Sequence, residues 1–222
     1  MIRTTNEGIW VIDHDTHFTK WVEEHKRLDT DHEYVVNLIK QYIDGNGAAI
    51  DFGANIGTQT FAYTKFFGDR SVIAIEPNPE CVECLKRNVP NSIIIQAAVS
   101  DKCEEKSLFL QDNVGASYII DGIGIKTIVL DDCEPVLSAA VTHKPFTFIK
   151  MDIEGYEIKA LKGGKEFIKK YKPIMWIEVN VITLNRNGST EDDLLNLITN
   201  YGYKYNSFPE RGIQYDVLCI PI

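Results

Sequence analysis

The sequence predicts one α/β domain built on a mostly parallel central sheet. Its 222 residues, 44% hydrophobic and 25% charged, are enough for a single substantial core. Short apolar runs alternate with helical patterns, as in repeated strand–helix–strand units. These runs contain few polar residues, which is typical of parallel strands buried on both faces. We therefore expect one domain over residues 1–222, with a helical lead-in over 1–45 and a core over 46–222.

The expected strands and helix ends follow from local sequence. The apolar runs that we assign to the central sheet are 48–52, 72–75, 93–95, 146–149 and 174–177. Asn78-Pro79-Glu80 supplies a helix N-cap followed by proline at the first helical position. Gly163-Gly164 is a suitable end for a helix that begins near Gly155.

The lead-in is predicted to be helical, because apolar residues recur every three or four positions between Tyr34 and Ile43. One apolar face of this kind packs most simply on the sheet. The lead-in also carries four histidines, for which surface positions or a place in a lid over a ligand are the two interpretations: His14, His17, His25 and His32.

Two further segments depart from the strand–helix alternation. Residues 107–130 contain short alternating runs around glycines, which predicts an inserted hairpin, and insertions of this kind often shape substrate pockets. After a last helix that starts at Glu191, residues 203–208 and 214–220 alternate like a terminal antiparallel pair.

The composition argues against several classes of partner. The formal net charge of −9, from 23 Lys+Arg and 32 Asp+Glu, disfavours nucleic acid and anionic membranes. No apolar segment approaches the roughly 20 residues of a membrane span, and the first residues lack a signal-peptide pattern. Five scattered cysteines without a second CxxC pair indicate neither a disulfide framework nor a four-ligand zinc site. We expect a cytoplasmic protein that acts on a small molecule, as a monomer or a homodimer.

A glycine-containing turn follows the first expected strand. The stretch Asp51-Phe52-Gly53-Ala54-Asn55-Ile56-Gly57-Thr58 leads into a helix, and its glycines let the backbone approach a ligand at the helix N-terminus. Dinucleotide-binding folds prefer G-x-G-x-x-G, whereas the spacing here is G-x-x-x-G. The pyrophosphate cradle is therefore incomplete. The structural alternative is a tight strand-to-helix turn with a satisfied acid.

Glu76 ends the second expected strand, nineteen residues after Gly57, where an acid can accept hydrogen bonds from both ribose hydroxyls. A carboxylate there disfavours the 2′-phosphate of NADP. What remains is a nucleoside cofactor without a pyrophosphate, and S-adenosylmethionine fits. Asp51 suits its ammonium group, and the loop N–H groups suit its carboxylate. An NAD-dependent oxidoreductase and a non-catalytic cofactor-binding module are the alternatives.

Five groups of motifs occur in order between about Ala48 and Asn180. They are IDFGANIGTQT, IAIEPNP followed by CLKRNV, IQAAVSD, TIVLDD, and FIKMDIEGYEIKALKGG followed by PIMWIEVN. In this order they resemble the FkbM-like family of class I S-adenosylmethionine-dependent methyltransferases. The resemblance implies a Rossmann-like, three-layer sandwich around a seven-stranded sheet with an antiparallel last strand.

The resemblance also implies the cofactor contacts. They come from the glycine loop, from the acid at the end of the second strand, and from a pair of alanines beside the adenine: Asp51, Gly53, Ala54, Asn55, Gly57, Thr58, Glu76, Pro77, Ala97 and Ala98. The lead-in, the insertion at 107–130 and the segment after Asn180 are poorly covered by the resemblance. We expect acceptor selection there.

The stretch KMDIEGYE, residues 150–157, places several charges directly after an expected strand. In an extended chain Lys150, Asp152 and Glu154 point to one side. The carboxyl ends of parallel strands also meet at one crevice, so further acids should converge there: Asp51, Glu76 and Glu178.

Two interpretations of this acidic stretch do not involve acid–base catalysis. In the first, Asp152 or Glu154 caps the helix that follows, and Glu157 in its first turn complements the helix dipole. In the second, Asp152, Glu154 and Glu178 supply oxygen ligands for Mg²⁺. We disfavour this metal site because Lys150 on the same side would repel the ion.

The third interpretation is catalytic, and we favour it. Asp152, Glu154 or Glu178 accepts the proton of an acceptor hydroxyl while the methyl group moves in line, and Lys150 tunes the acids by charge pairing. Which acid acts stays open. The sequence thus predicts S-adenosylmethionine-dependent O-methylation of a sugar or another small hydroxylated metabolite. That acceptor rests on the resemblance.

Overall fold

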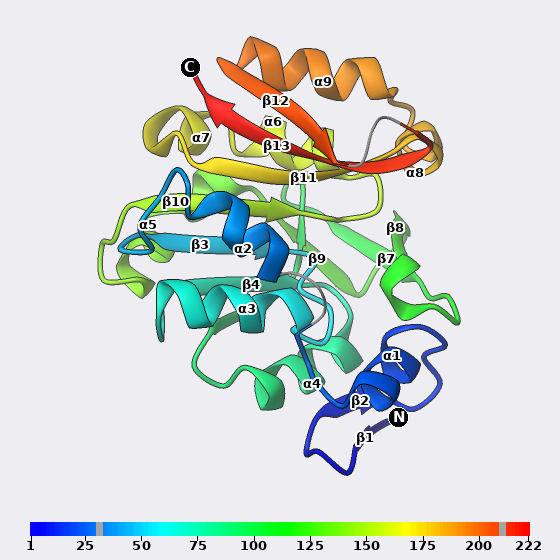
Figure 1. Ribbon diagram of the computed structural model, residues 1–222. Coiled ribbons are helices and arrows are strands. Elements are labelled where there is room, and N and C mark those ends of the chain that lie inside the picture. Colours follow the sequence, from blue (N-terminus) through cyan, green and yellow to red (C-terminus); the bar gives the residue numbers. More distant parts are fainter. Residues whose placement is uncertain (30–32, 209–211) are drawn as a thin grey trace.

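The computed structural model describes residues 1–29, 33–208 and 212–222. Its centre is a seven-stranded sheet of order β12-β13-β11-β10-β3-β4-β5 (Figure 1). The strands are β3 (Ala48–Phe52), β4 (Val72–Glu76), β5 (Ile93–Gln96), β10 (Phe146–Met151), β11 (Ile174–Asn180), β12 (Tyr203–Phe208) and β13 (Gln214–Pro221). The strands β3, β4, β5, β10 and β11 pair in parallel, and β13 lies antiparallel between β11 and the edge strand β12. The predicted antiparallel last strand is confirmed.

Helices cover both faces of the sheet and make three layers. One face packs against α2 (Glu33–Ile39), α3 (Thr58–Phe67) and α4 (Pro79–Asn88). The other packs against α5 (Leu130–Ala140), α6 (Glu157–Gly163), α7 (Lys165–Tyr171) and α9 (Glu191–Asn200). Because parallel strands are buried on both sides, the near-continuous apolar runs of the sequence are explained. The three-layer α/β prediction is confirmed.

The strand register brings charged residues together at the carboxyl edge of the sheet. Lys150 on β10 lies opposite Asp51 on β3, and Glu178 on β11 lies opposite Asp216 on β13. All four therefore belong to one end of the sheet, beside the loops that lead into the helices. This is the edge where open α/β sheets bind their ligands.

The insertion forms a small second sheet of order β6-β9-β7-β8. Its strands are β6 (Ala98–Val99), β7 (Glu105–Phe109), β8 (Tyr118–Asp121) and β9 (Ile125–Ile128). β7 and β8 pair antiparallel, as the alternating runs predicted. A 3-10 turn, η1 (Val114–Ala116), connects them.

The lead-in is only partly helical. The helices α1 (Phe18–His25) and α2 are present, but an antiparallel hairpin, β1 (Ile2–Thr4) with β2 (Trp10–Ile12), precedes them. Strands of three residues show too little alternation to be recognised in a sequence. The hairpin docks on α4, since Trp10 N–H donates to Asn88 Oδ1 and Asn88 Nδ2 donates to Trp10 O, each at 2.8 Å.

The first part of the lead-in, from β1 to α1, and the insertion lie on the same side of the molecule, beyond the ends of β3 and β4 (Figure 1). They are also joined directly, because Thr16 N–H donates to Asp112 O at 2.8 Å. Within the described ranges, none of the helices has the length and apolarity that crossing a membrane requires.

Candidate cofactor and active site

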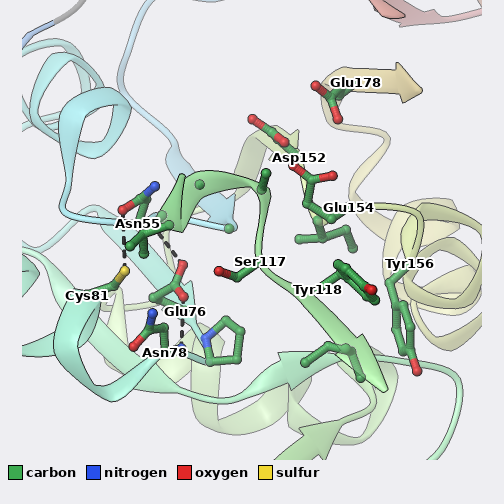
Figure 2. A pocket seen from close by; sticks show the side chains of 18 of the residues that line it. Asn55, Glu76, Asn78, Cys81, Ser117, Tyr118, Asp152, Glu154, Tyr156 and Glu178 are labelled. Atoms are coloured by element: carbon green, nitrogen blue, oxygen red, sulfur yellow. Dashed lines mark hydrogen bonds between the residues drawn. The ribbon is translucent and has the colours of Figure 1, made fainter. Parts of the chain in front are cut away.

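A cavity of about 390 Å³ opens at the carboxyl edge of the sheet. Its lining comes chiefly from the lead-in, the insertion, the β3–α3 and β10–α6 loops, the ends of β4 and β11, and residues 97–99, 182–186 and 214. Figure 2 shows the side chains of its wall, with Asn55, Glu76 and Asn78 on one side and Asp152, Glu154 and Glu178 on the other. One cavity therefore joins the predicted cofactor residues to the predicted catalytic acids.

The glycine loop is held against the β10–α6 loop by backbone contact. Gly53 has φ +77°, and a Cβ there would lie 1.9 Å from the carbonyl oxygen of Asp152. Asp152 N–H donates to Phe52 O at 3.2 Å. Only glycine fits this combination of positive φ and close approach. Gly53 thus fixes the spacing between the two halves of the cavity.

Glu76 is buried and fastens the glycine loop to the start of α4. Its Oε2 accepts from Asn55 N–H and its Oε1 accepts from Asn78 N–H, both at 2.8 Å, as Figure 2 shows. A carboxylate has about four lone-pair sites, so acceptor positions are left that face the cavity. Burial raises the pKa of Glu76 to about 7, against the lowering effect of these two hydrogen bonds.

Most of the predicted cofactor residues line the cavity. They are Gly53, Ala54, Asn55, Thr58, Glu76, Pro77, Ala97 and Ala98. Gly57 does not, since it packs behind the loop against α4, where an added Cβ would lie 2.9 Å from the Leu85 side chain. The predicted helix start at Asn78 is also present, because its side chain accepts from Glu80 N–H.

Asp51 is fully buried and does not line the cavity either. Its Oδ2 accepts from Thr60 Oγ1 at 2.6 Å, and its Oδ1 lies 3.3 Å from Lys150 Nζ. The expected direct approach of Asp51 to a cofactor ammonium is therefore absent from this geometry. A buried carboxylate needs a close countercharge, and Lys150 supplies it.

Lys150 is buried beneath the glycine loop. Its Nζ donates to Gly53 O at 2.9 Å and to Phe52 O at 3.2 Å, and it lies 3.7 Å from Asp152 Oδ2. Burial lowers the pKa of this ammonium, but Asp51 and Asp152 outweigh burial, so the pKa stands above its ordinary value. Lys150 thus stays charged and links the cofactor loop to the predicted catalytic acids.

Three carboxylates form what we call the acidic cluster: Asp152, Glu154 and Glu178. One oxygen from each lies within 4.8 Å of the others, and Figure 2 shows the three groups close together at the cavity wall. Glu154 has φ +54°, a conformation that non-glycine residues rarely adopt. Burial and the neighbouring carboxylates raise the pKa of Glu154 to about 8 and that of Glu178 to about 10.

Glu157 is structural, and the predicted capping of α6 by Asp152 or Glu154 is wrong. The helix begins at Glu157 after Tyr156, which makes no side-chain cap. Glu157 Oε1 instead accepts from Ile153 N–H at 3.1 Å and from Gly155 N–H at 3.2 Å. Because Glu157 satisfies these amides itself, the carboxylates of the acidic cluster are available to the cavity.

Sequence reasoning named His17 as one candidate for a lid but missed Phe18, the other lead-in residue at the cavity. His17 and Phe18 line it, and the Phe18 ring packs so closely on Gly115 that an added Cβ would lie 2.5 Å from it. Asp15 Oδ1 accepts from Val114 N–H at 3.0 Å. The histidines of the lead-in suggested a lid, but no pattern in the sequence indicated that this lid contacts the insertion. Residue 32, another of these histidines, lies outside the described residues.

A second wall of the cavity was also missed. Arg186, at the end of α8 (Val181–Arg186), stacks its guanidinium 3.8 Å from the ring centre of Tyr118 on β8. Tyr118 in turn stacks on Phe109, with 5.0 Å between ring centres. This wall joins the insertion to the segment after Asn180, where acceptor selection was expected.

The sheet with its antiparallel last strand, the glycine loop and the acid at the end of β4 together define the fold of class I S-adenosylmethionine-dependent methyltransferases. The chain belongs to the methyltransferase FkbM domain family, whose model matches residues 51–205. The predicted family and its cofactor, S-adenosylmethionine, are confirmed.

Solved structures support the fold. The methyltransferase FkbM from Methylobacillus flagellatus KT is 20% identical with a TM-score of 0.50, over 79% of this chain and 44% of that one. A TehB-like S-adenosylmethionine-dependent methyltransferase from Corynebacterium glutamicum is 13% identical with a TM-score of 0.51, over 92% and 97%. The magnesium protoporphyrin IX methyltransferase of Synechocystis, solved with S-adenosylmethionine, is 9% identical with a TM-score of 0.50, over 94% and 93%.

A curated relative is the hexuronic acid methyltransferase AglP of Haloferax volcanii. It is 28% identical over 138 residues, which are 58% of this chain and 54% of AglP. The match therefore spans about half the length of that relative.

Proposed function

We propose that this protein transfers a methyl group from S-adenosylmethionine to an oxygen of a small hydroxylated molecule, with a sugar or sugar acid as the leading acceptor class. The observation that carries the proposal is the shared cavity. Glu76, the acid that we assign to the ribose, lines the same cavity as the acidic cluster. The close contact between Gly53 and Asp152 holds the β3–α3 loop against the β10–α6 loop.

The cavity residues fit the cofactor. Glu76 keeps acceptor positions for ribose hydroxyls, and Ala97 with Ala98 offers a small apolar surface for the adenine. The N–H groups of Gly53, Ala54 and Asn55 already donate to Ile75 O or to Glu76, so the loop N–H groups expected to meet the cofactor carboxylate are engaged within the protein. When bound, S-adenosylmethionine supplies an electrophilic methyl group on a sulfonium. Phe18 packs on Gly115, and both residues line the cavity.

The acidic cluster serves the acceptor. A sugar hydroxyl is a weak acid, so a carboxylate within reach of its oxygen assists transfer by taking the proton as the new C–O bond forms. Such a base contributes roughly 10²–10⁴-fold in rate, and alignment of the two reactants contributes about 7–11 kcal/mol. Lys150 holds Asp152 beside the glycine loop, which sets where that proton acceptor lies relative to the cofactor.

The acceptor class is supported by the relative rather than by residues alone. AglP is a hexuronic acid methyltransferase, and its match to this protein extends over 58% of the present chain. A hexuronic acid offers ring hydroxyls and a carboxylate, both of which are oxygen acceptors. The Arg186–Tyr118 wall lies at the cavity beside the cluster and is a suitable contact for such an anionic sugar.

Methyl transfer can be tested with isotopically labelled methyl donor and mass spectrometry of neutral sugars, hexuronic acids and non-sugar alcohols. We expect labelled product on at least one sugar class, and loss of that product in at least one of Asp152→Asn, Glu154→Gln and Glu178→Gln. Asp69→Asn is the matched control, because Asp69 is exposed in the turn between α3 and β4, at the opposite edge of the sheet.

Two outcomes would contradict the proposal. Cofactor binding without transfer to any oxygen acceptor would favour a non-catalytic binding module. Undiminished transfer in all three of Asp152→Asn, Glu154→Gln and Glu178→Gln would remove the acidic cluster from the chemistry.

A further inference from the structure

We propose that the acidic cluster is a divalent cation site of the Mg²⁺, Mn²⁺ or Ca²⁺ class. The carboxylate oxygens of Asp152, Glu154 and Glu178 lie within 4.8 Å of one another. Oxygen ligands bind these ions at about 2.0–2.6 Å, so two ligands of one ion are at most about 5 Å apart. The three oxygens therefore already have the spacing of ligands around one ion.

A buried carboxylate oxygen of Glu178 without a hydrogen-bond partner in the described part of the chain supports the cation site independently of the spacing of the three acids. The residue is only 8% exposed, and its Oε2 has no hydrogen-bond partner among the described residues. Its other oxygen, Oε1, accepts from Gln214 Nε2 at 2.6 Å, which fixes the orientation of the carboxylate. A buried, unsatisfied carboxylate oxygen is unfavourable, and a cation at the cluster would satisfy it.

Lys150 is the obvious objection, since an ammonium in the cluster would repel a cation. Its shortest contacts, however, are with Gly53 O at 2.9 Å, Phe52 O at 3.2 Å and Asp51 Oδ1 at 3.3 Å, whereas Asp152 is 3.7 Å away. The ammonium is thus engaged beneath the glycine loop. Its nearer carboxylate is Asp51, and Asp152 is the more distant of the two.

The ligand chemistry selects the class of ion. The cluster offers only carboxylate oxygens, and Asn180 and Gln214 also line the cavity with amide groups. Hard oxygen donors suit Mg²⁺, Mn²⁺ and Ca²⁺, whereas Zn²⁺ and Cu²⁺ sites usually carry imidazole or thiolate.

In methyl transfer the ion would hold the acceptor hydroxyl at an open coordination position, and only this role rests on the proposed function. Coordination makes the O–H group more acidic. Its proton leaves to water or to a carboxylate oxygen not bound to the ion, the new C–O bond forms, and the C–S bond breaks with its electron pair retained by sulfur.

The test is a titration of the full chain with Mn²⁺ in the absence of any acceptor. Electron paramagnetic resonance measures the concentration of free Mn²⁺ at each step. We expect one saturable site. Glu178→Gln and Asp152→Asn should each weaken it by at least about tenfold, and Gln214→Ala, which frees the Glu178 carboxylate, by about 10–100-fold. Asp69→Asn should bind Mn²⁺ like the unchanged protein. Circular dichroism and thermal melting establish that each variant is folded.

Two results would overturn the inference: no saturable Mn²⁺ binding, or equal binding by Asp69→Asn and folded Glu178→Gln. Both leave methyl transfer by a carboxylate base intact. Conversely, saturable Mn²⁺ binding together with no methyl transfer to any oxygen acceptor would support the cation site and contradict the proposed function. The two proposals therefore fail separately.

Discussion

The protonation of Glu76 should make cofactor binding depend on pH. The carboxylate is buried and accepts two backbone N–H groups, and burial raises its pKa to about 7. Lys150 and Asp51 act on it with opposite signs, and Cys81, whose Sγ donates to Asn55 Oδ1, lies nearby. Ribose hydroxyls donate hydrogen bonds to the ionised form, so ligand binding favours the charged carboxylate and must displace a proton at low pH.

The magnitude follows from this pKa. With a pKa of about 7, Glu76 is mostly ionised at pH 8 and mostly protonated at pH 6, which weakens binding by about tenfold between these values. The contribution of Glu76 to the free energy of unfolding depends on pH in the opposite direction. Because the folded pKa is raised from 4.5, the contribution of Glu76 to folding is full below pH 4.5 and declines by roughly 3 kcal/mol as the pH rises through 7. Cofactor binding should therefore stabilise the fold most at high pH.

Isothermal titration calorimetry with S-adenosylhomocysteine at pH 6, 7 and 8 measures the effect without turnover. Glu76→Gln should lose about 10²-fold in affinity, because charge-assisted hydrogen bonds are worth roughly 1.5–3 kcal/mol each, and its residual binding should be flat with pH. Asp69→Asn should keep the wild-type slope. A flat profile in the unchanged protein, or an unchanged slope in Glu76→Gln, would refute the assignment of Glu76 to the ribose.

Three further substitutions test the framework of the cavity. Gly53→Ala should lower the melting temperature and abolish cofactor binding, because its Cβ would meet Asp152 O and φ is +77°. Lys150→Met should cost about 3–5 kcal/mol in urea unfolding by leaving Asp51 buried without its countercharge, and adding Asp51→Asn should recover part of this loss. Phe18→Ala should weaken S-adenosylhomocysteine binding by about tenfold, equivalent to about 1.4 kcal/mol, with little change in melting temperature; equal binding would argue against a lid.

The sheet was predictable because strands that are buried on both faces have locally apolar sequences. Each apolar run at 48–52, 72–75, 93–95, 146–149 and 174–177 lies in a strand, since few polar residues are tolerated in a layer that is buried on both faces. The hairpin β1–β2 was not predictable from a local pattern. It is held by a contact with Asn88, 78 residues further along the chain, and a local pattern carries no information about such a partner.

The candidate site was predictable in its position but not in its connections. Convergence of Glu76, Asp152 and Glu178 follows from parallel strand order, which sets one edge for all of them. The capping interpretation of Asp152 or Glu154 fails, because the sequence does not distinguish which of several nearby acids accepts the loop amides. The geometry shows that Glu157 accepts the N–H groups of Ile153 and Gly155.

Lys150 shows why the two halves of the cavity depend on each other. From the sequence, this lysine was a charge beside the acids and an obstacle to a metal. In the structure its ammonium binds Gly53 O, Asp51 and Asp152 together, so it stabilises the glycine loop and places the first acid of the cluster in the same contact. A shift of the glycine loop would therefore move Asp152, so the cofactor position and the proposed acceptor position would be coupled through one buried charge.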